Sequence, residues 1–396
     1  MDAFPTPFDL VAQDRPENPV ACIRPGRAGA AARWFADRFP GRALYAVKAN
    51  PAPWAIDEIF HAGITGFDVA SPREMRAVAE RCPGAELAFL HPIKSRRAIA
   101  EAYFDFDVRI FALDSLDELD KLHEATGGAT DLTLMVRLAV DNDSALLPLV
   151  GKFGVSAFDA TDVLRAARRY AARFGVSFHV GSQCMDPRAF GGAMAEASRR
   201  LTRAGVTAEI VDAGGGFPSI YPGMTPPPLD AYATAIAEGF ETMNVVETAE
   251  LWCEPGRALV AETTSLVVRV ELRKGDALFI NDGAYGNLFD AAHMDWRFPA
   301  RLLRPHADNA AELAPFRLFG PTCDSIDAMA GPFDLPADIR EGDYIEIGQI
   351  GAYGATMRTQ FNGFGETREV TVADRPWPSL YDATPLPPAD AEEAHG

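Results

Sequence analysis

The chain is short of positive charge, and this shortage excludes one class of partner. Lysine and arginine together number 37 against 56 aspartates and glutamates, which leaves a formal net charge of -19 at pH 7. A protein that binds a phosphate backbone needs clustered lysine and arginine, so we expect no nucleic-acid partner. The field of an acidic protein would instead concentrate a small cationic molecule.

Cysteines are also few. The five cysteines are scattered along 396 residues without a CxxC pair, which argues against a zinc knuckle and a disulfide framework. We therefore predict no metal site. Reduced thiols suit the cytosol, and we expect a cytoplasmic protein.

Long apolar runs are missing as well. No uninterrupted stretch reaches the length that a membrane-spanning helix needs, so no membrane partner is expected. The first residues, MDAFPTPFDLVAQDRPENP, are acidic and rich in proline. They lack the basic and then apolar pattern of a signal peptide.

From residue 42 to residue 254, short apolar runs alternate with longer amphipathic stretches. The runs predict strands, and the stretches at 73–81, 157–173 and 188–203 predict helices. Strand followed by helix, repeated over a little more than two hundred residues, is typical of a (β/α)8 barrel. A doubly wound open sheet is the alternative, but no GxGxxG follows the first strand. The predicted strands are residues 44–49, 66–70, 87–90, 108–112, 132–138, 176–180, 209–211 and 251–254.

After Glu254 the pattern changes to strands with no helices between them. These strands are separated by glycine and proline turns, which indicates an all-β second domain. We predict an α/β barrel over residues 27–255 and a β-sandwich or β-barrel over residues 256–396. Residues 1–26 would join the second domain through a strand at 20–23. The strands predicted for this domain are residues 264–272, 277–282, 316–319, 344–347 and 370–372.

A polar residue stands at the carboxyl end of every predicted barrel strand. In such barrels the reacting groups lie at this face. Buried strands are otherwise apolar, and although a single polar residue can simply mark where a strand reaches solvent, eight in succession favour a site. These residues are Lys48, Asp68, His91, Asp114, Arg137, His179, Asp212 and Glu254.

Lys48 is the most distinctive of them. It follows Leu-Tyr-Ala-Val and precedes Ala-Asn-Pro, so an ammonium ends an otherwise apolar run. Burial disfavours the charged form of lysine, and we therefore expect a lowered pKa and an amine free for Schiff-base chemistry. The alternative is a structural ion pair with Asp68 or Glu74.

Three consecutive glycines stand at positions 214–216, after the seventh predicted strand. Their N–H groups are not covered by side chains, and barrels commonly bind a phosphate at this place. A glycine triplet can also be no more than a turn. Ser182 and Arg257 could complete a phosphate site, whereas Arg257 could alternatively pair with Glu254, three residues before it.

Seven stretches of the sequence resemble a known family, in the order in which that family carries them. It is the ornithine, lysine and diaminopimelate decarboxylase family, which has the alanine-racemase fold and uses pyridoxal 5'-phosphate, and the ornithine decarboxylases within it are most similar. The resemblance covers nearly the whole chain. The stretches are YAVKANP (45–51), GFDVAS (66–71), VSFHVGSQ (176–183), DAGGGFP (212–218), EPGR (254–257), GPTCDS (320–325) and GAYGATMRTQFNGF (351–364).

The resemblance implies pyridoxal 5'-phosphate as the cofactor and a role for each matching residue. Lys48 is placed like the lysine that binds the cofactor covalently, and His179 like the histidine that stacks on its ring. Glu254 resembles the partner of the pyridine nitrogen, which keeps the ring able to accept electrons. The other residues implied to bind the cofactor are Asp68, Arg137, Ser182, Gly214, Gly215, Gly216, Arg257 and Tyr353.

Two further residues come from the predicted second domain. Cys323 resembles the cysteine that protonates the product, and Asp324 the acid that binds the distal amine of the substrate. In the family they come from the other subunit, so the resemblance implies a homodimer with shared active sites. Cys323 could alternatively be a small buried apolar residue. Asp290 is the second candidate for the distal amine, in a segment after Tyr285 that is shorter than in ornithine decarboxylases of higher organisms.

The implied reaction is the decarboxylation of L-ornithine to putrescine, a step of polyamine biosynthesis, with Lys48, His179, Glu254 and Cys323 as catalytic residues. A dual lysine and ornithine decarboxylase is the first alternative. Diaminopimelate decarboxylase is the next alternative and is less favoured, since that branch has glutamate where this chain has Asp324. Arginine is disfavoured as a substrate, because arginine decarboxylases are expected to be much longer chains. Racemases share the fold, and some family members are inactive regulatory binding proteins.

Overall fold

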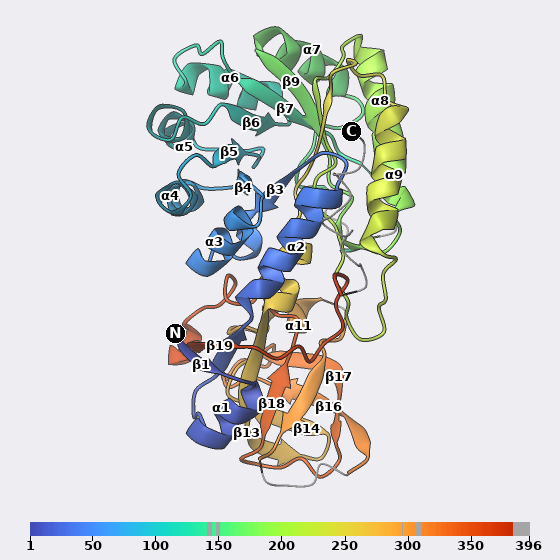
Figure 1. Ribbon diagram of the computed structural model, residues 1–396. Helices are drawn as coiled ribbons and strands as arrows, with labels where there is room; N and C mark the ends of the chain where they lie inside the picture. Colours follow the sequence, from blue (N-terminus) through green and yellow to red (C-terminus); the bar gives the residue numbers. More distant parts are fainter. Residues whose placement is uncertain (141–144, 148–150, 295, 306–310, 383–396) are drawn as a thin grey trace, which may run out of the picture.

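A closed barrel and a mostly β second domain make up the molecule (Figure 1). The computed structural model describes residues 1–140, 145–147, 151–294, 296–305 and 311–382. The predicted fold class is confirmed as a (β/α)8 barrel with a separate domain that is mostly β.

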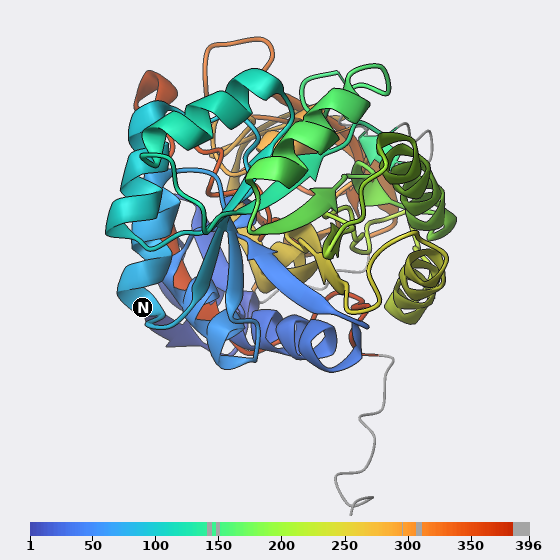
Figure 2. The same ribbon diagram turned by 90° about the horizontal axis from the view of Figure 1, so that it is seen from above.

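Parallel strands form the barrel, and helices surround it on the outside (Figure 2). Each strand is hydrogen-bonded to the next, and the last strand, β12, pairs with the first, β3. The strands are β3 (Arg42–Ala46), β4 (Gly66–Val69), β5 (Glu86–Phe89), β6 (Ile110–Leu113), β7 (Thr133–Arg137), β9 (Arg173–Ser177), β11 (Ile210–Asp212) and β12 (Glu250–Cys253). The helices are α2 (Pro25–Arg38), α3 (Pro53–His61), α4 (Pro72–Arg81), α5 (Arg96–Ala100), α6 (Leu116–Ala125), α7 (Ala160–Tyr170), α8 (Arg188–Ala204) and α9 (Leu229–Glu241).

A serine caps the first turn of several of these helices. Ser71 precedes α4, and its hydroxyl accepts a hydrogen bond from the N–H of Glu74 at 3.3 Å. Ser115 precedes α6 and accepts in the same way from the N–H of Glu118 at 3.2 Å. Both hydroxyls satisfy an N–H that would otherwise lack a partner in the first turn. The helices in the described part of the chain are each too short or too polar to cross a lipid bilayer.

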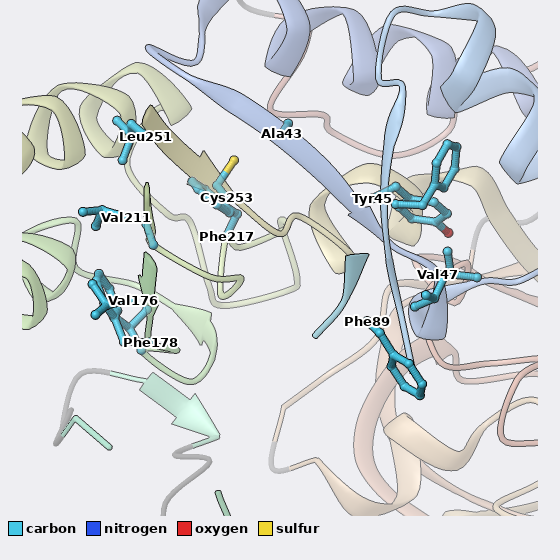
Figure 3. Close-up of a cluster of buried hydrophobic side chains, with 14 of the residues drawn as sticks. Ala43, Tyr45, Val47, Phe89, Val176, Phe178, Val211, Phe217, Leu251 and Cys253 are labelled. Atoms are coloured by element: carbon cyan, nitrogen blue, oxygen red, sulfur yellow. The ribbon is translucent and has the colours of Figure 1, made fainter. Parts of the chain in front are cut away.

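Alternate residues of the barrel strands face opposite sides. On β12, Leu251 and Cys253 pack outward against the helices, and Figure 3 shows part of this outer layer. Trp252 between them points into the barrel, where it packs with Met135 and other apolar side chains. Gly175 makes room there, because a Cβ at this position would lie 2.3 Å from the Met135 sulfur. Replacing a buried tryptophan such as Trp252 by alanine typically costs about 3–5 kcal/mol.

The predicted barrel strands all exist, although several end earlier than predicted. The strand predicted over 44–49 ends at Ala46, and a short 3-10 turn over Val47–Ala49 follows it. The strand predicted over 176–180 is β9 and ends at Ser177. Strand residues near the barrel mouth therefore give way to turns, and these turns carry Lys48 and His179.

The second domain is built around a nine-stranded sheet. Strand β2 pairs with β13 and with β19, so the prediction that residues 20–23 join this domain is confirmed. The predicted boundaries at residues 27 and 256 stay a prediction. The strands are β1 (Asp2–Phe4), β2 (Val20–Ile23), β13 (Thr264–Lys274), β14 (Ala277–Ile280), β15 (Ala300–Leu303), β16 (Leu313–Phe319), β17 (Ala328–Pro336), β18 (Tyr344–Ile347) and β19 (Arg368–Val372), and α1 (Pro7–Asp14) follows β1.

Three elements of this domain differ from the predictions. Strand β17 was not predicted because Gly331, Pro332 and Pro336 lie in it. It ends the hydrogen-bonded path of the sheet, and an edge strand tolerates a proline that donates no hydrogen bond. Strand β15 was also missed. The prediction that no helix separates the strands is wrong, since α11 (Phe289–His293) lies between β14 and β15.

The chain returns to the barrel after β19. The Tyr381 hydroxyl donates to the carbonyl of Ala258 at 2.7 Å, and Ala258 belongs to the short helix α10 (Arg257–Val260). Arg27 on α2 forms an ion pair with Asp382 at 2.7 Å. This segment therefore ties the second domain to the end of the barrel that carries Arg257.

Candidate active site

A cavity of about 440 Å³ opens at the carboxyl ends of the barrel strands. It gathers every residue predicted to bind the cofactor except Gly214. It is also lined by His91, which was noted only as a strand-end residue. The predicted residues in the lining are Lys48, Asp68, Arg137, His179, Ser182, Gly215, Gly216, Glu254, Arg257 and Tyr353.

Lys48 is the amine of this cavity. Its Nζ lies 3.1 Å from Oδ2 of Asp68, which is buried, while the Lys48 side chain itself is 43% exposed. Burial by itself lowers the pKa of the amine, but the carboxylates of Asp68 and Glu254 outweigh burial and raise the pKa above its ordinary value. The prediction of a lowered pKa is therefore wrong for the protein alone, because two carboxylates stand beside the amine.

Two buried carboxyl groups lie next to each other at this site. Glu254 lines the cavity, and we call this part of the lining the floor, whereas Asp212 lies beside Glu254 outside the lining. Burial, together with neighbouring carboxylates, raises the pKa of Glu254 well above its ordinary value. Burial also raises the pKa of Asp212, to about 6. Lys48 and Arg137 offset only part of this effect. Such a floor suits a cationic group such as a protonated ring nitrogen, which would stabilise the Glu254 carboxylate.

His179 is held in one orientation. Its Nδ1 accepts a hydrogen bond from the N–H of Gly181 at 2.9 Å. Burial, together with the cations Arg137 and Lys48, lowers the pKa of His179 to about 3, so the ring is neutral. A Cβ at Gly215 would lie 3.0 Å from the His179 Nε2. The absence of a side chain at Gly215 thus leaves room beside the imidazole for a flat ring.

Two glycines of the triplet are required for two reasons: their φ angles are positive, and a Cβ would collide with a neighbouring backbone carbonyl. Gly214 has φ +70° and a Cβ there would lie 2.0 Å from the carbonyl oxygen of Phe178. Gly216 has φ +107° and a Cβ there would lie 2.5 Å from that of Gly181. Gly214 supports the floor from behind, because its carbonyl accepts from the N–H of Glu254 at 2.9 Å. Backbone free of side chains is what a phosphate needs.

Arg257 stands beside the glycines as the cation of this phosphate site. Its Nε donates to the Ser182 hydroxyl at 3.4 Å and its Nη1 to the Tyr221 hydroxyl at 3.1 Å. Nη1 also lies 2.8 Å from Oδ2 of Asp290, and both side chains of this ion pair are buried. Arg257 does not pair with Glu254 among the described residues. A side-chain-free backbone, a hydroxyl and a guanidinium together fit a phosphate group.

Asp290 has a different partner from the one predicted. Its carboxylate contacts Arg257 and does not line the cavity, so it is not placed to meet the distal amine of a substrate. The reason is that a buried guanidinium requires a buried counter-charge. Sequence reasoning missed Tyr221 and Trp296, which also contact Arg257, because both lie in irregular segments without a periodic pattern.

Cys323 and Asp324 lie elsewhere, in a groove of about 740 Å³ on the second domain. Cys323 is exposed, which excludes the reading as a buried apolar residue, and its thiol lies 3.3 Å from Oδ1 of Asn362. The Tyr285 hydroxyl donates to Oδ2 of Asp324 at 2.6 Å, and this bond lowers the pKa of Asp324. Neither residue lines the cavity of Lys48 within this chain.

The loop after β7 adds two residues that the sequence did not indicate. Lys152 and Phe153 line the cavity, and the His91 ring meets Phe153 edge-on with the ring centroids 5.2 Å apart. Asp114 lies outside the cavity and holds this loop, since its Oδ2 accepts from the N–H of Gly154 at 2.9 Å. Loop residues carry no periodic signal, and only the structure brings them to the site.

Comparison with known proteins agrees with this geometry. Residues 28–261 match the family described as "Pyridoxal-dependent decarboxylase, pyridoxal binding domain". The lysine/ornithine decarboxylase of Selenomonas ruminantium is 30% identical over 384 residues, which cover 94% of this chain and 91% of that protein. Antizyme inhibitor 2 of Xenopus laevis is 29% identical over 354 residues, which cover 82% of this chain and 74% of that protein.

Among solved structures, the arginine decarboxylase of Paramecium bursaria Chlorella virus has a TM-score of 0.81 and 25% sequence identity. The match covers 92% of this chain and 98% of that chain. The two chains are therefore of similar length, and the expectation that arginine decarboxylases are much longer is wrong. Chain length does not argue against arginine as a substrate.

Proposed function

We propose that this chain, which belongs to the pyridoxal-dependent decarboxylase family, converts L-ornithine to putrescine in polyamine biosynthesis. Pyridoxal phosphate is the cofactor of this family. The proposal is carried by the single cavity in which Lys48, the Glu254 floor and the glycine and Arg257 phosphate site meet. The five free cysteines further suit a reducing compartment such as the cytoplasm.

Some residues of the cavity would bind the cofactor, and others would transfer protons. Pyridoxal phosphate, when bound, supplies an aldehyde that an amine can capture and a ring that withdraws electrons from the bond to the departing carboxylate. The raised pKa of Lys48 means that its ammonium must lose a proton before it can attack. Asp68 Oδ2, 3.1 Å away, is placed to accept that proton.

The remaining groups hold and orient the cofactor. Gly215 and Gly216, with Ser182 and Arg257, would hold the phosphate. Asp290 keeps Arg257 in place through their buried ion pair. Glu254 would hold the ring nitrogen, and the neutral His179 would lie against one face of the ring.

We further propose a homodimer in which Cys323 and Asp324 of one subunit complete the cavity of the other. Both face an open groove, and three exposed apolar residues lie near them. Ile326 follows Asp324 closely in the sequence, Phe364 lines the groove, and Phe361 precedes Asn362, which contacts the Cys323 thiol. Apolar side chains in such a place favour burial against a second chain. Asp324 would then bind the distal ammonium of the substrate, and the Cys323 thiol would give a proton to the carbon that has lost its carboxylate.

The preference for ornithine is one of several substrate choices. A dual lysine and ornithine decarboxylase is supported by the relative from Selenomonas ruminantium, which carries that name. Asp324, in place of a glutamate, argues against diaminopimelate. The similarity to antizyme inhibitor 2 supports an inactive binding protein, but Lys48, Cys323 and the phosphate site are all intact.

Two measurements on the purified protein test the proposal. Bound cofactor should give visible absorbance that borohydride removes, with the label recovered on Lys48 in a digest. Release of carbon dioxide should then be compared for ornithine, lysine, arginine and diaminopimelate. We expect the highest kcat/KM on ornithine. Equal values on ornithine and lysine would favour the dual enzyme, and a colourless protein would refute the proposal.

A further inference from the structure

One wall of the cavity, formed by Arg137, Lys152 and His91, carries hydrogen-bond donors that have no acceptor among the residues that the structure describes. Arg137 and Lys152 line the cavity, and neither has an ion-pair partner among the described residues. His91 follows β5 and lies near both cations, because its ring meets Phe153, the ring that Arg137 and Lys152 also face. A wall of uncommitted donors is suited to an anionic oxygen of a ligand.

The hydrogen bonding of His91 determines which nitrogen carries its proton. The N–H of Ile93 donates to Nδ1 of His91 at 3.1 Å, so Nδ1 is an acceptor. Burial, together with Lys94 and Lys48, lowers the pKa of His91, and the ring is neutral. A neutral imidazole with an accepting Nδ1 carries its proton on Nε2. In the part of the chain that the structure describes, this N–H has no acceptor.

A buried ammonium fixes the backbone of His91. Lys94 is fully buried, and its Nζ donates to the carbonyls of His91 at 2.8 Å, of Pro92 at 3.2 Å and of Ala112 at 2.5 Å. It also pairs with Glu118 at 3.0 Å. A buried charge with four oxygen partners strongly resists displacement. These bonds of Lys94 therefore hold the backbone of His91, and its imidazole, in one orientation before any ligand binds.

His91 and His179 share one local geometry but not one environment. In both, Nδ1 accepts from the N–H two residues later. The Nε2 of His179 lies next to Gly215, against the floor. The His91 ring instead meets the ring of Phe153 edge-on. The resemblance of this chain to its family gives a role to His179 and none to His91.

We propose that His91 is a ligand-binding residue whose Nε2–H donates a hydrogen bond to an anionic oxygen of the bound ligand. This inference rests on the proposed function. Two oxygens share the required chemistry, the phenolic oxygen of the cofactor and the carboxylate of the amino acid. The carboxylate is absent from the diamine product, and the phenolic oxygen is present before any substrate binds. These differences allow the two to be distinguished.

The test uses the holoenzyme with His91→Leu, which removes the donor, and His91→Gln, which keeps one. If the acceptor is the substrate carboxylate, His91→Leu should raise KM for the amino acid about tenfold, as expected for one hydrogen bond to a charged group. The inhibition constant of the diamine and the absorbance of the bound cofactor should not change. If the acceptor is the phenolic oxygen, the absorbance of the substrate-free holoenzyme should shift. His91→Gln should restore part of either change.

The matched control is His61→Leu, since His61 is exposed on α3 outside the cavity. It should leave the absorbance, KM and the inhibition constant at wild-type values. If His91→Leu also leaves all three at wild-type values, the role of His91 is refuted while the proposed function stands. Absence of cofactor absorbance in the wild-type protein would refute the proposed function and this inference together.

Discussion

The barrel mouth and the loop that carries Cys323 differ in how far one chain completes them. At the barrel mouth, Lys48 and Arg257 each have an ion-pair partner within the chain. The Cys323 loop faces an open groove, and Asp324 accepts hydrogen bonds from Tyr285 and Ile326 of its own domain. Cofactor binding is thus expected from a single chain, whereas turnover should depend on assembly.

The largest effect should come from variants that damage one region each. We expect Lys48→Ala to lose nearly all activity because the covalent link is lost, and Cys323→Ala to lose most of it because the proton donor is lost. Mixing the two variants should restore about a quarter of the wild-type activity, since half of the randomly paired dimers hold one intact site of two. Activity is measured before and after the variants are mixed and allowed to exchange subunits.

The control for this experiment is a mixture of two preparations of Lys48→Ala, which should stay inactive. If the mixed variants also stay inactive although subunit exchange is demonstrated by mass spectrometry, both damaged residues act in the same site of one chain. The contrast between the two regions would then be wrong.

A smaller effect should follow from Asp290→Asn, which tests whether the ion pair with Arg257 contributes to cofactor binding at the barrel mouth. Removing the carboxylate leaves Arg257 without its buried counter-charge, so the guanidinium should be held less firmly for the phosphate. We expect the dissociation constant of pyridoxal phosphate to rise about tenfold, the effect of losing roughly one interaction with a charged group. It is measured by titrating the apoprotein and following absorbance.

The matched control is Asp276→Asn. Asp276 pairs with Arg317 at 3.1 Å, but both side chains are exposed and far from the cavity lining. Cofactor affinity should not change in this variant. Unchanged affinity in Asp290→Asn would show that Arg257 needs no help from the second domain.

The smallest effect concerns stability near the barrel mouth, where Glu262 contacts Arg27 of α2 and Leu380 of the segment after β19. Burial raises the pKa of Glu262 from 4.5 to about 7, although Arg27 lowers it in part. The folded protein then binds this proton more tightly than the unfolded chain, so the free energy of unfolding falls as pH rises from about 4.5 to about 7. Glu262→Gln cannot ionise and should be more stable than wild type above pH 7, by about 1–3 kcal/mol.

Thermal unfolding of Glu262→Gln and wild type at pH 5 and pH 8 measures this difference. The two proteins should unfold at similar temperatures at pH 5 and at different temperatures at pH 8. The control is Glu271→Gln, the same exchange at an exposed side chain of β13. A gap between variant and wild type that is the same at both pH values would contradict the buried-carboxyl explanation.

Sequence reasoning predicted the barrel and most of the cavity because both depend on local pattern. Apolar strands ending in a polar residue placed Lys48, Asp68 and Glu254 at one face. Two kinds of feature were out of reach. The raised pKa of Lys48 depends on carboxylates brought close by pairing between strands, and the ion pair between Arg257 and Asp290 joins α10 and α11, which are separate in the sequence. Neither leaves a periodic signal in the chain.

The sheet of the second domain has a consequence for the order in which the protein matures during synthesis. Strand β2, made early, lies between β13 and β19, and β19 also pairs with β1. All eight barrel strands leave the ribosome before β13 does. The barrel can therefore close while β1 and β2 are still unpaired, because β13 and β19 have not yet been synthesised. A translational pause before residues 368–372 would therefore hold a folded barrel next to unpaired strand edges, which is when binding of a chaperone would matter most.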